Sequence, residues 1–153
     1  MNLCKSIPIS CIKLNLTGAD KPAVIEELLD ILVQADLVPN RKTALKALLE
    51  REKQMSTGFD NGIAIPHGKC DTLTGIVACL GISQTGIEFD SIDGEASTIF
   101  IMTLSPENRK AYHLEFLGAV SGLLSENAYR EAILAAETPE EIHRVFIQAS
   151  AEE

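Results

Sequence analysis

The sequence predicts a single α/β domain, because strongly apolar strands alternate with amphipathic helices along its 153 residues. The strands expected at residues 76–82 and 97–104 are nearly continuous apolar runs, which is typical of strands that are covered on both faces. Apolar residues make up 46% of the chain, enough for one core, and no linker-like segment divides it. We therefore expect residues 1–153 to form one domain with helices on both faces of a sheet.

The first third of the chain predicts a strand followed by two helices. Apolar residues within 9–14 favour the strand. Between residues 24 and 33 the apolar side chains recur every three or four positions, so a helix should begin after Asp20, a suitable N-cap. A second helix should begin after Asn40 and end in the charged residues 50–53.

The middle of the chain predicts loops and short strands. Residues 56–62 are dense in turn-forming residues, and the pair Asn61-Gly62 favours positive φ angles. A short strand should follow at 63–65. Residues 86–94 carry three carboxylates, but their spacing does not match a calcium-binding EF-hand loop, so we expect a turn between two strands.

The last third predicts three helices, at residues 111–124, 127–136 and 139–148. Thr138 is a suitable N-cap for the last of them, and Glu141 completes a capping box. These helices supply cover for the apolar strands.

Charge and composition exclude several classes of function. The 13 Lys and Arg residues and 22 Asp and Glu residues give a net charge of −9, which would repel a nucleic-acid backbone. The longest apolar runs are far shorter than the roughly 20 residues that span a bilayer. The N-terminus does not resemble a secretory signal, and the four cysteines contain no C-x-x-C pair. We expect a cytoplasmic protein with reduced thiols that is not embedded in a membrane and does not bind nucleic acid.

The segment best suited to chemistry is 56–69, which contains His67. Pro66 restricts the backbone before the imidazole and Gly68 permits another molecule to approach, so we expect a loop that presents His67. A histidine near its ordinary pKa of about 6.5 is largely neutral at neutral pH, and its free ring nitrogen can accept a phosphoryl group. A half-buried structural histidine is the alternative that these residues alone leave open.

A zinc site is a weaker alternative at the same place. His67 and Cys70 form a plausible local pair of ligands. Structural zinc generally needs four protein ligands and catalytic zinc three, so the pair is too small. We expect neither a metal ion nor a cofactor.

Across nearly its whole length the sequence resembles the fructose/mannitol-type enzyme IIA domains of the bacterial phosphoenolpyruvate-dependent phosphotransferase system, a group that includes the nitrogen-regulatory IIA proteins. The resemblance rests on S-T-G-x-x-N-G-I-A-I-P-H-G-K at 56–69, with Arg51-Glu52 ahead of it and G-I-E-F-D-S-I-D-G at 86–94 behind it. It implies a mixed β-sheet flanked by helices. It also implies that His67 takes a phosphoryl group from the phosphocarrier HPr or a paralogue.

The resemblance implies roles for two further residues. Arg51 matches an arginine that helps to hold the phosphoryl group, a task that suits the guanidinium fork. A cation that stabilises the C-terminus of a helix is the other interpretation of Arg51. His113 matches a second histidine beside the active one, which could donate to the phosphoryl oxygens or fix the tautomer of His67. His143 matches nothing in the family, and its charged neighbours predict a solvated helix face.

Residues close to His67 in sequence are candidates for binding the phosphoryl group. Thr57, and less strongly Ser56, would offer hydroxyl or backbone N–H donors, and Gly58 would shape the loop. Lys69 would attract a phosphate or an acidic partner, unless it is simply solvated. The Phe59-Asp60 pair departs from the Ile-Gly more usual in the family, which leaves the loop conformation and the choice of partner open.

Three functions follow from these observations. The first is a phosphotransferase component that is phosphorylated on His67 and passes the group to a cysteine of a IIB partner, starting sugar uptake. The second is a regulator of the nitrogen type, which signals to target proteins through its phosphorylation state. The third is a structural domain that carries no labile phosphoryl group. The sequence does not decide between transport and regulation.

Overall fold

The computed structural model describes residues 2–151 of the chain. The elements follow in the order α1 (Leu3–Ser6), η1 (Ile9–Cys11), β1 (Ile12–Lys13), α2 (Lys21–Gln34), α3 (Arg41–Gln54), β2 (Ile63–Ala64), β3 (His67–Lys69), β4 (Val77–Ile87), β5 (Ser97–Ser105), η2 (Glu107–Arg109), α4 (Lys110–Leu124), α5 (Asn127–Ala135) and α6 (Pro139–Ala151), where η marks a 3-10 helix.

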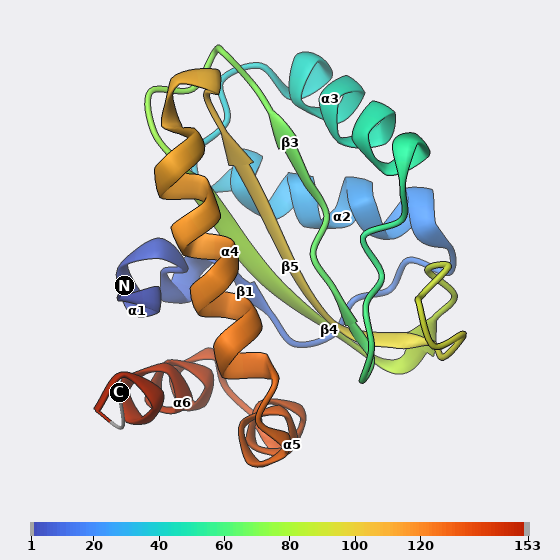
Figure 1. Cartoon of the computed structure of the whole chain (residues 1–153), viewed down its shortest axis with the longest axis vertical. Helices are drawn as coiled ribbons and strands as arrows, with labels where there is room; N and C mark the ends of the chain where they lie inside the picture. The colour runs from blue at the N-terminus through green and yellow to red at the C-terminus, as the bar shows by residue number, and fades with distance from the viewer. Residues whose placement is uncertain (1, 152–153) are drawn as a thin grey trace.

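The sheet is mixed, as the family resemblance implies. Its order is β1-β4-β5-β2, and β3 also pairs with β5 (Figure 1). Strands β4 and β5 are antiparallel, whereas β1 runs parallel to β4, and β2 and β3 both run parallel to β5. Ile63 pairs with Ile99 and His67 with Thr103, so β2 and β3 lie end to end along one edge of β5.

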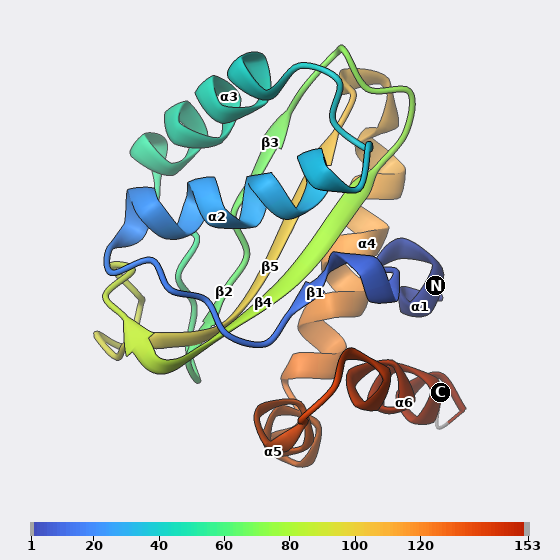
Figure 2. The ribbon, with the colours of Figure 1, turned by 180° about the vertical axis from the view of Figure 1, so that it is seen from behind.

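Helices cover both faces of the sheet, which confirms the prediction from the apolar strands. Successive side chains of β5 point to opposite faces. Ile99 and Ile101 pack into a core with α1, α4, α5 and α6, whereas Phe100 and Met102 pack into a second core with α2 and α3. Figures 1 and 2 show α4 on one side of the sheet and α2 on the other.

The first two long helices begin where their caps predict. The side chain of Asp20 accepts a hydrogen bond from the backbone N–H of Ala23 at 2.9 Å, and that of Asn40 accepts from Thr43 at 3.1 Å. Helix α3 ends at Gln54, just before the turn-rich segment 56–62. This ending places Arg51 in the last turn of α3, where a cation is favoured by the helix dipole.

The start of the chain differs from the prediction of a strand over residues 9–14. Residues Ile9–Cys11 form a 3-10 turn in which the N–H of Cys11 donates to the carbonyl of Pro8, so that N–H is not available to β4. The strand is reduced to Ile12–Lys13. The short helix α1, capped by the side chain of Asn2, was not predicted.

Strand β3 corrects the expectation that His67 lies on a loop. Residues His67–Lys69 pair with Thr103–Ser105 of β5, a contact between distant parts of the chain that local turn signals do not reveal. Gly68 allows close packing, because a Cβ atom there would lie only 3.3 Å from the backbone of Ala47 in α3. Helix α3 therefore lies directly against β3.

The remaining predicted elements agree with the structure. Asn61 and Gly62 adopt positive φ angles of 65° and 74° in the predicted loop. Strand β4 extends to Ile87, beyond the predicted end at residue 82, and residues 88–96 connect it to the antiparallel strand β5, so most of the segment 86–94 forms the expected turn. The three C-terminal helices are present, and the N–H of Glu141 donates to the hydroxyl of Thr138 at 3.3 Å. Within residues 2–151 we find no helix with the length and apolar character needed to cross a membrane.

Candidate active site

His67 begins β3 and is half-buried. Its Nδ1 lies 2.8 Å from the backbone carbonyl oxygen of Ile65. A carbonyl oxygen can only accept a hydrogen bond, so Nδ1 of the neutral ring carries the hydrogen. The lone pair of Nε2 is then the free nucleophile of the ring. Pro66, between the two residues, holds the backbone in the shape that this short contact needs.

A surface cleft brings His67 together with three of the other candidate residues. Arg51 enters it from the end of α3, Lys69 from β3 and His113 from α4. Figure 1 shows α3 and α4 on the two sides of β3. The other residues that line the cleft are Ala47, Glu50, Gln54, Gly68, Glu107, Lys110, Leu114 and Leu117.

His113 is buried beside His67, with only 4% of its surface exposed. The centroids of the two rings are 5.7 Å apart, and the ring planes meet at 68°. Nδ1 of His113 lies 3.0 Å from Nζ of Lys69, which also donates to the hydroxyl of Ser105 at 3.0 Å. Among residues 2–151, Nε2 of His113 is the only buried side-chain nitrogen or oxygen that lacks a hydrogen-bond partner.

The electrostatics of the cleft keep both imidazoles neutral. Burial is the largest cause that lowers the pKa of His67, and the charges of Arg51 and Lys69 lower it further, against the raising effect of the bond to Ile65. Burial, followed by the charge of Lys69 and by that of His67 when its ring is protonated in acid, lowers the pKa of His113 to about 4. At neutral pH each ring therefore keeps one nitrogen free of hydrogen.

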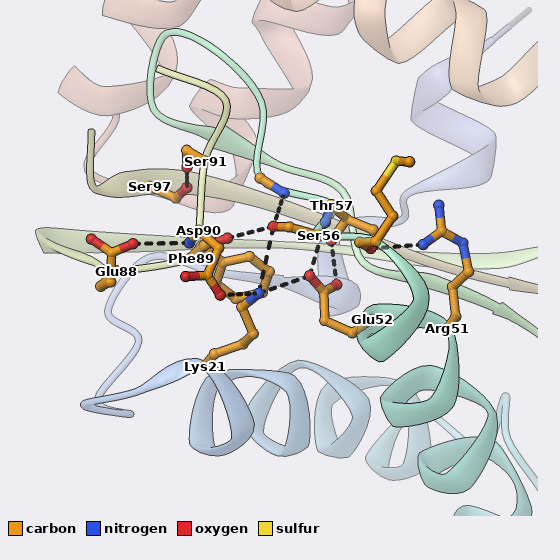
Figure 3. Close-up of polar contacts among 12 residues, drawn as sticks. Lys21, Arg51, Glu52, Ser56, Thr57, Glu88, Phe89, Asp90, Ser91 and Ser97 are labelled. Atoms are coloured by element: carbon orange, nitrogen blue, oxygen red, sulfur yellow. Dashed lines mark hydrogen bonds and ion pairs between the residues drawn. The ribbon is translucent and has the colours of Figure 1, made fainter. Parts of the chain in front are cut away.

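The position of Arg51 is compatible with both roles that the sequence left open. Its Nη1 donates to the backbone carbonyl of Met55 at 2.8 Å, which satisfies an acceptor at the C-terminus of α3 (Figure 3). A guanidinium has five N–H donors, so this bond leaves others for a ligand. Arg51 also lines the cleft of His67.

Ser56, Thr57 and Gly58 do not line this cleft. The N–H and hydroxyl of Thr57 both donate to the carboxylate of Glu52, at 2.8 and 2.6 Å, and Thr57 is buried (Figure 3). The hydroxyl of Ser56 donates to the carbonyl of Phe89 at 2.6 Å and accepts from the N–H of Gly58. The structure thus directs these donors into the fold, away from the role of phosphate contacts that the sequence suggested.

Glu52 is an important residue that sequence reasoning did not single out. It is buried at the end of α3, and its carboxylate lies 2.9 Å from Nζ of Lys21 (Figure 3). Lys21 also pairs with Asp90 at 3.0 Å and lies 4.6 Å from the ring centroid of Phe89. The sequence contains a signal for its burial, because Glu52 continues the four-residue spacing of the buried α3 positions Ala44 and Leu48.

The prediction of a solvated face for His143 was wrong. Its Nε2 lies 2.6 Å from the backbone oxygen of Ile7, and its ring is half-buried against Phe146. The reason is that α6 packs against the short helix α1, which the sequence did not predict. Phe59 and Asp60, in contrast, are both exposed in the segment before β2.

No group of three or more His, Cys, Asp or Glu residues placed to hold a metal ion occurs in residues 2–151. Cys70, the suggested partner of His67, is buried, and its thiol lies 3.0 Å from the hydroxyl of Thr72. The four cysteines form no disulfide.

The mixed sheet, its two helical layers and a cleft that brings two histidines together with Arg51 and Lys69 define the class that the sequence resembles, the IIA-type phosphotransfer domains. The family described as "Phosphoenolpyruvate-dependent sugar phosphotransferase system, EIIA 2" matches residues 5–149, and the chain belongs to this family. Its members are phosphotransfer components of that system.

Individual relatives agree with this assignment. A fructose-specific EIIA component from Haloferax volcanii is 37% identical over 141 residues, which cover 92% of each chain. A fructose-specific EIIABC component from Bacillus subtilis is 32% identical over 97% of this chain, which spans only 23% of that relative's length. The crystal structure of the nitrogen regulatory protein IIA-Ntr from Neisseria meningitidis matches with a TM-score of 0.88 and 27% identity, over 94% of this chain and 98% of that one.

Proposed function

We propose that this chain accepts a phosphoryl group on Nε2 of His67 and passes it to a second protein. The observation that carries the proposal is the 2.8 Å contact between Nδ1 of His67 and the carbonyl of Ile65. This contact leaves Nε2 as the free nitrogen of a ring that lines the cleft. The lowered pKa of His67 keeps that nitrogen unprotonated at neutral pH.

The transfer itself exchanges one P–N bond for another. The lone pair of His67 Nε2 attacks the phosphorus of a phosphohistidine on the carrier, and the bond between phosphorus and the carrier's nitrogen breaks with its electron pair returning to that nitrogen. The hydrogen on Nδ1 of His67 stays there, hydrogen-bonded to the carbonyl of Ile65, so the imidazole needs no proton transfer. The guanidinium of Arg51 and the unpartnered Nε2 of His113 would bind the phosphoryl oxygens as charge develops.

The donor would be an HPr-like phosphocarrier. For the next step, the family offers two routes. The Bacillus subtilis relative is a fructose-specific EIIABC component, which supports transfer to a cysteine of a IIB partner in sugar uptake. The likeness to a nitrogen regulatory IIA protein supports the alternative, in which the phosphorylation state controls binding to a target protein.

The test is phosphorylation with labelled phosphoenolpyruvate, enzyme I and an HPr-type carrier. The parent protein should take up one acid-labile phosphoryl group and the His67→Ala variant none. His143→Ala is the matched control, because His143 lies on α6, outside the cleft, and should not change the labelling. Stoichiometric labelling of His67→Ala, or no labelling of the parent, would overturn the proposal.

Two additional measurements refine it. Nitrogen-15 NMR of the phosphorylated protein should place the P–N bond on Nε2 of His67, and a bond on Nδ1 would contradict the role of Ile65. Adding a fructose-type IIB protein to the labelled chain separates the two routes. Rapid loss of label to the IIB cysteine favours sugar uptake, whereas retention of the label favours regulation.

A further inference from the structure

We infer that Lys69 is a positioning residue that fixes the tautomer of His113, so that the buried Nε2 of His113 is a neutral N–H donor beside His67. This inference rests on the proposed function of His67. Its evidence is separate, however, because it concerns the hydrogen bonds on the far nitrogen of His113. The sequence left Lys69 either as a phosphate contact or as a solvated side chain, and the structure gives it a different partner.

The tautomer follows from what each group can donate. The ammonium of Lys69 has three donors and no acceptor. Its Nζ lies 3.0 Å from Nδ1 of His113, so Nδ1 has to accept and cannot carry a hydrogen. A neutral imidazole has one hydrogen, which is then on Nε2. This is the buried nitrogen that has no partner within residues 2–151.

Lys69 is held in place by the sheet. It is directly opposite Ser105 in the parallel pairing of β3 with β5, and its Nζ donates to the Ser105 hydroxyl at 3.0 Å. Ser105 is fully buried, so this second bond anchors the ammonium at a fixed distance from α4. The flexible lysine side chain is thereby restricted to the geometry that His113 needs.

A neutral donor suits a site that has to release the phosphoryl group again. The ammonium of Lys69 opposes protonation of His113, so the ring donates a hydrogen bond without becoming an imidazolium that would form a tight ion pair with the phosphorylated state. Binding that is equally strong before and during transfer does not speed the reaction. Lys69 therefore acts on the transfer through His113, and it does not need to touch the phosphoryl group.

The experiment compares Lys69→Met with the conservative Lys69→Arg by nitrogen-15 NMR of the His113 ring, without any phosphorylation. The parent should show hydrogen on Nε2 alone, with widely separated shifts for the two ring nitrogens. In Lys69→Met the two shifts should move toward each other as both tautomers become populated, and Lys69→Arg should keep most of the separation. Lys110→Met is the matched control, because Lys110 lines the same cleft but pairs with Glu107, and it should leave the His113 tautomer unchanged.

Phosphoryl transfer is then measured on the same variants. Lys69→Met should be slower by about tenfold, near the lower end of the range found for residues that orient metal-binding histidines through a hydrogen bond, and Lys69→Arg should recover part of the rate. A parent ring with hydrogen on Nδ1, or unchanged His113 shifts in folded Lys69→Met, would overturn the inference. So would a changed tautomer with an unchanged rate. If the parent accepts no phosphoryl group, the proposed function fails, and the NMR result still decides whether Lys69 sets the tautomer.

Discussion

The carboxylate of Glu52 accepts both donors of Thr57, the backbone N–H at 2.8 Å and the hydroxyl at 2.6 Å. These bonds join the last turn of α3 to the segment that leads into β2 and β3 (Figure 3). Arg51 and His67 lie on the two sides of this junction in the chain, and both line the cleft. One buried acid, with Lys21 as its counter-ion, therefore holds together the two parts of the chain that build the site.

Glu52→Gln should destabilise the protein by about 2–3 kcal/mol, because it leaves the ammonium of Lys21 without its buried partner and weakens the bonds to Thr57. Urea unfolding followed by circular dichroism measures the free energy of unfolding. Glu50→Gln is the matched control, since Glu50 is an exposed carboxylate on the same helix, and it should change stability by less than about 0.5 kcal/mol. Equal effects of the two substitutions would show that the Glu52 bonds contribute nothing particular to the fold.

Stability should fall in acid because of His113. The pKa of His113 is about 4 in the folded protein, below its ordinary value of 6.5, so the unfolded chain binds the proton more tightly. This contribution is complete above pH 6.5 and is lost as the pH falls from 6.5 to about 4. The shift corresponds to about 3 kcal/mol.

The measurement is the free energy of unfolding at several pH values for the parent and for His113→Gln, which cannot titrate. The free energy of unfolding of the parent minus that of the variant should decrease as the pH falls from 6.5 to about 4, because only the parent loses the contribution of a neutral His113. Acid effects from carboxylates common to both proteins cancel in the comparison. A difference that stays constant from pH 7 to pH 4 would mean that His113 is not kept neutral by the fold.

Local signals predicted most of the fold. Asp20 and Asn40 cap the helices they were expected to cap, because an N-cap bonds to a backbone N–H only three residues away. The nearly continuous apolar runs of the strands predicted that helices cover both faces of the sheet. The pairing of β3 and the turn at Ile9–Cys11 were not predicted, because the first depends on β5, over 30 residues away, and the second on a local bond that competes with sheet pairing.

The site was predicted less completely than the fold. His67, Arg51 and His113 were placed together through the family resemblance, and the structure brings them into one cleft. The partner of Lys69 could not be predicted, since His113 is 44 residues away and the geometry depends on the register of β3 with β5. The donors of Thr57 were assigned to a phosphate because the burial of Glu52 was not recognised.

Arg51→Ala should slow phosphoryl transfer while the protein remains folded, because a cation is removed from the developing charge. Arg51→Lys should restore the rate only in part, since an ammonium lacks the two-point fork. The charge of Arg51 also lowers the pKa of His67, so a proton NMR titration should show a higher pKa of His67 in Arg51→Ala than in the parent. An unchanged transfer rate and an unchanged pKa of His67, accompanied by a large fall in thermal stability, would assign Arg51 only to the C-terminus of α3.

The surface around the cleft suggests how a carrier would dock. Helix α4 borders the His67 cleft through Leu114 and Leu117, and it also borders a second hollow, lined in part by Phe59 and Ile92. Ile92 is 75% exposed and Phe59 40% exposed. Exposed apolar side chains therefore lie at both hollows that α4 borders, on a protein whose net charge is −9.

Phe59→Ala should weaken binding of an HPr-type carrier by about tenfold, because a half-exposed aromatic side chain at the edge of an apolar surface is a typical anchor residue. Phosphorylation should still reach completion at high carrier concentration, since Phe59 lies outside the cleft of His67. Titration calorimetry at low and high salt measures the affinity. Ile147→Ala is the matched control, because Ile147 is 60% exposed on α6, at the end of the molecule away from α3 (Figure 1), and it should not change binding. If the affinity is the same in Phe59→Ala as in the parent but falls steeply with added salt, the interface is instead held by charged residues. Salt screens exposed charges and leaves apolar contacts intact.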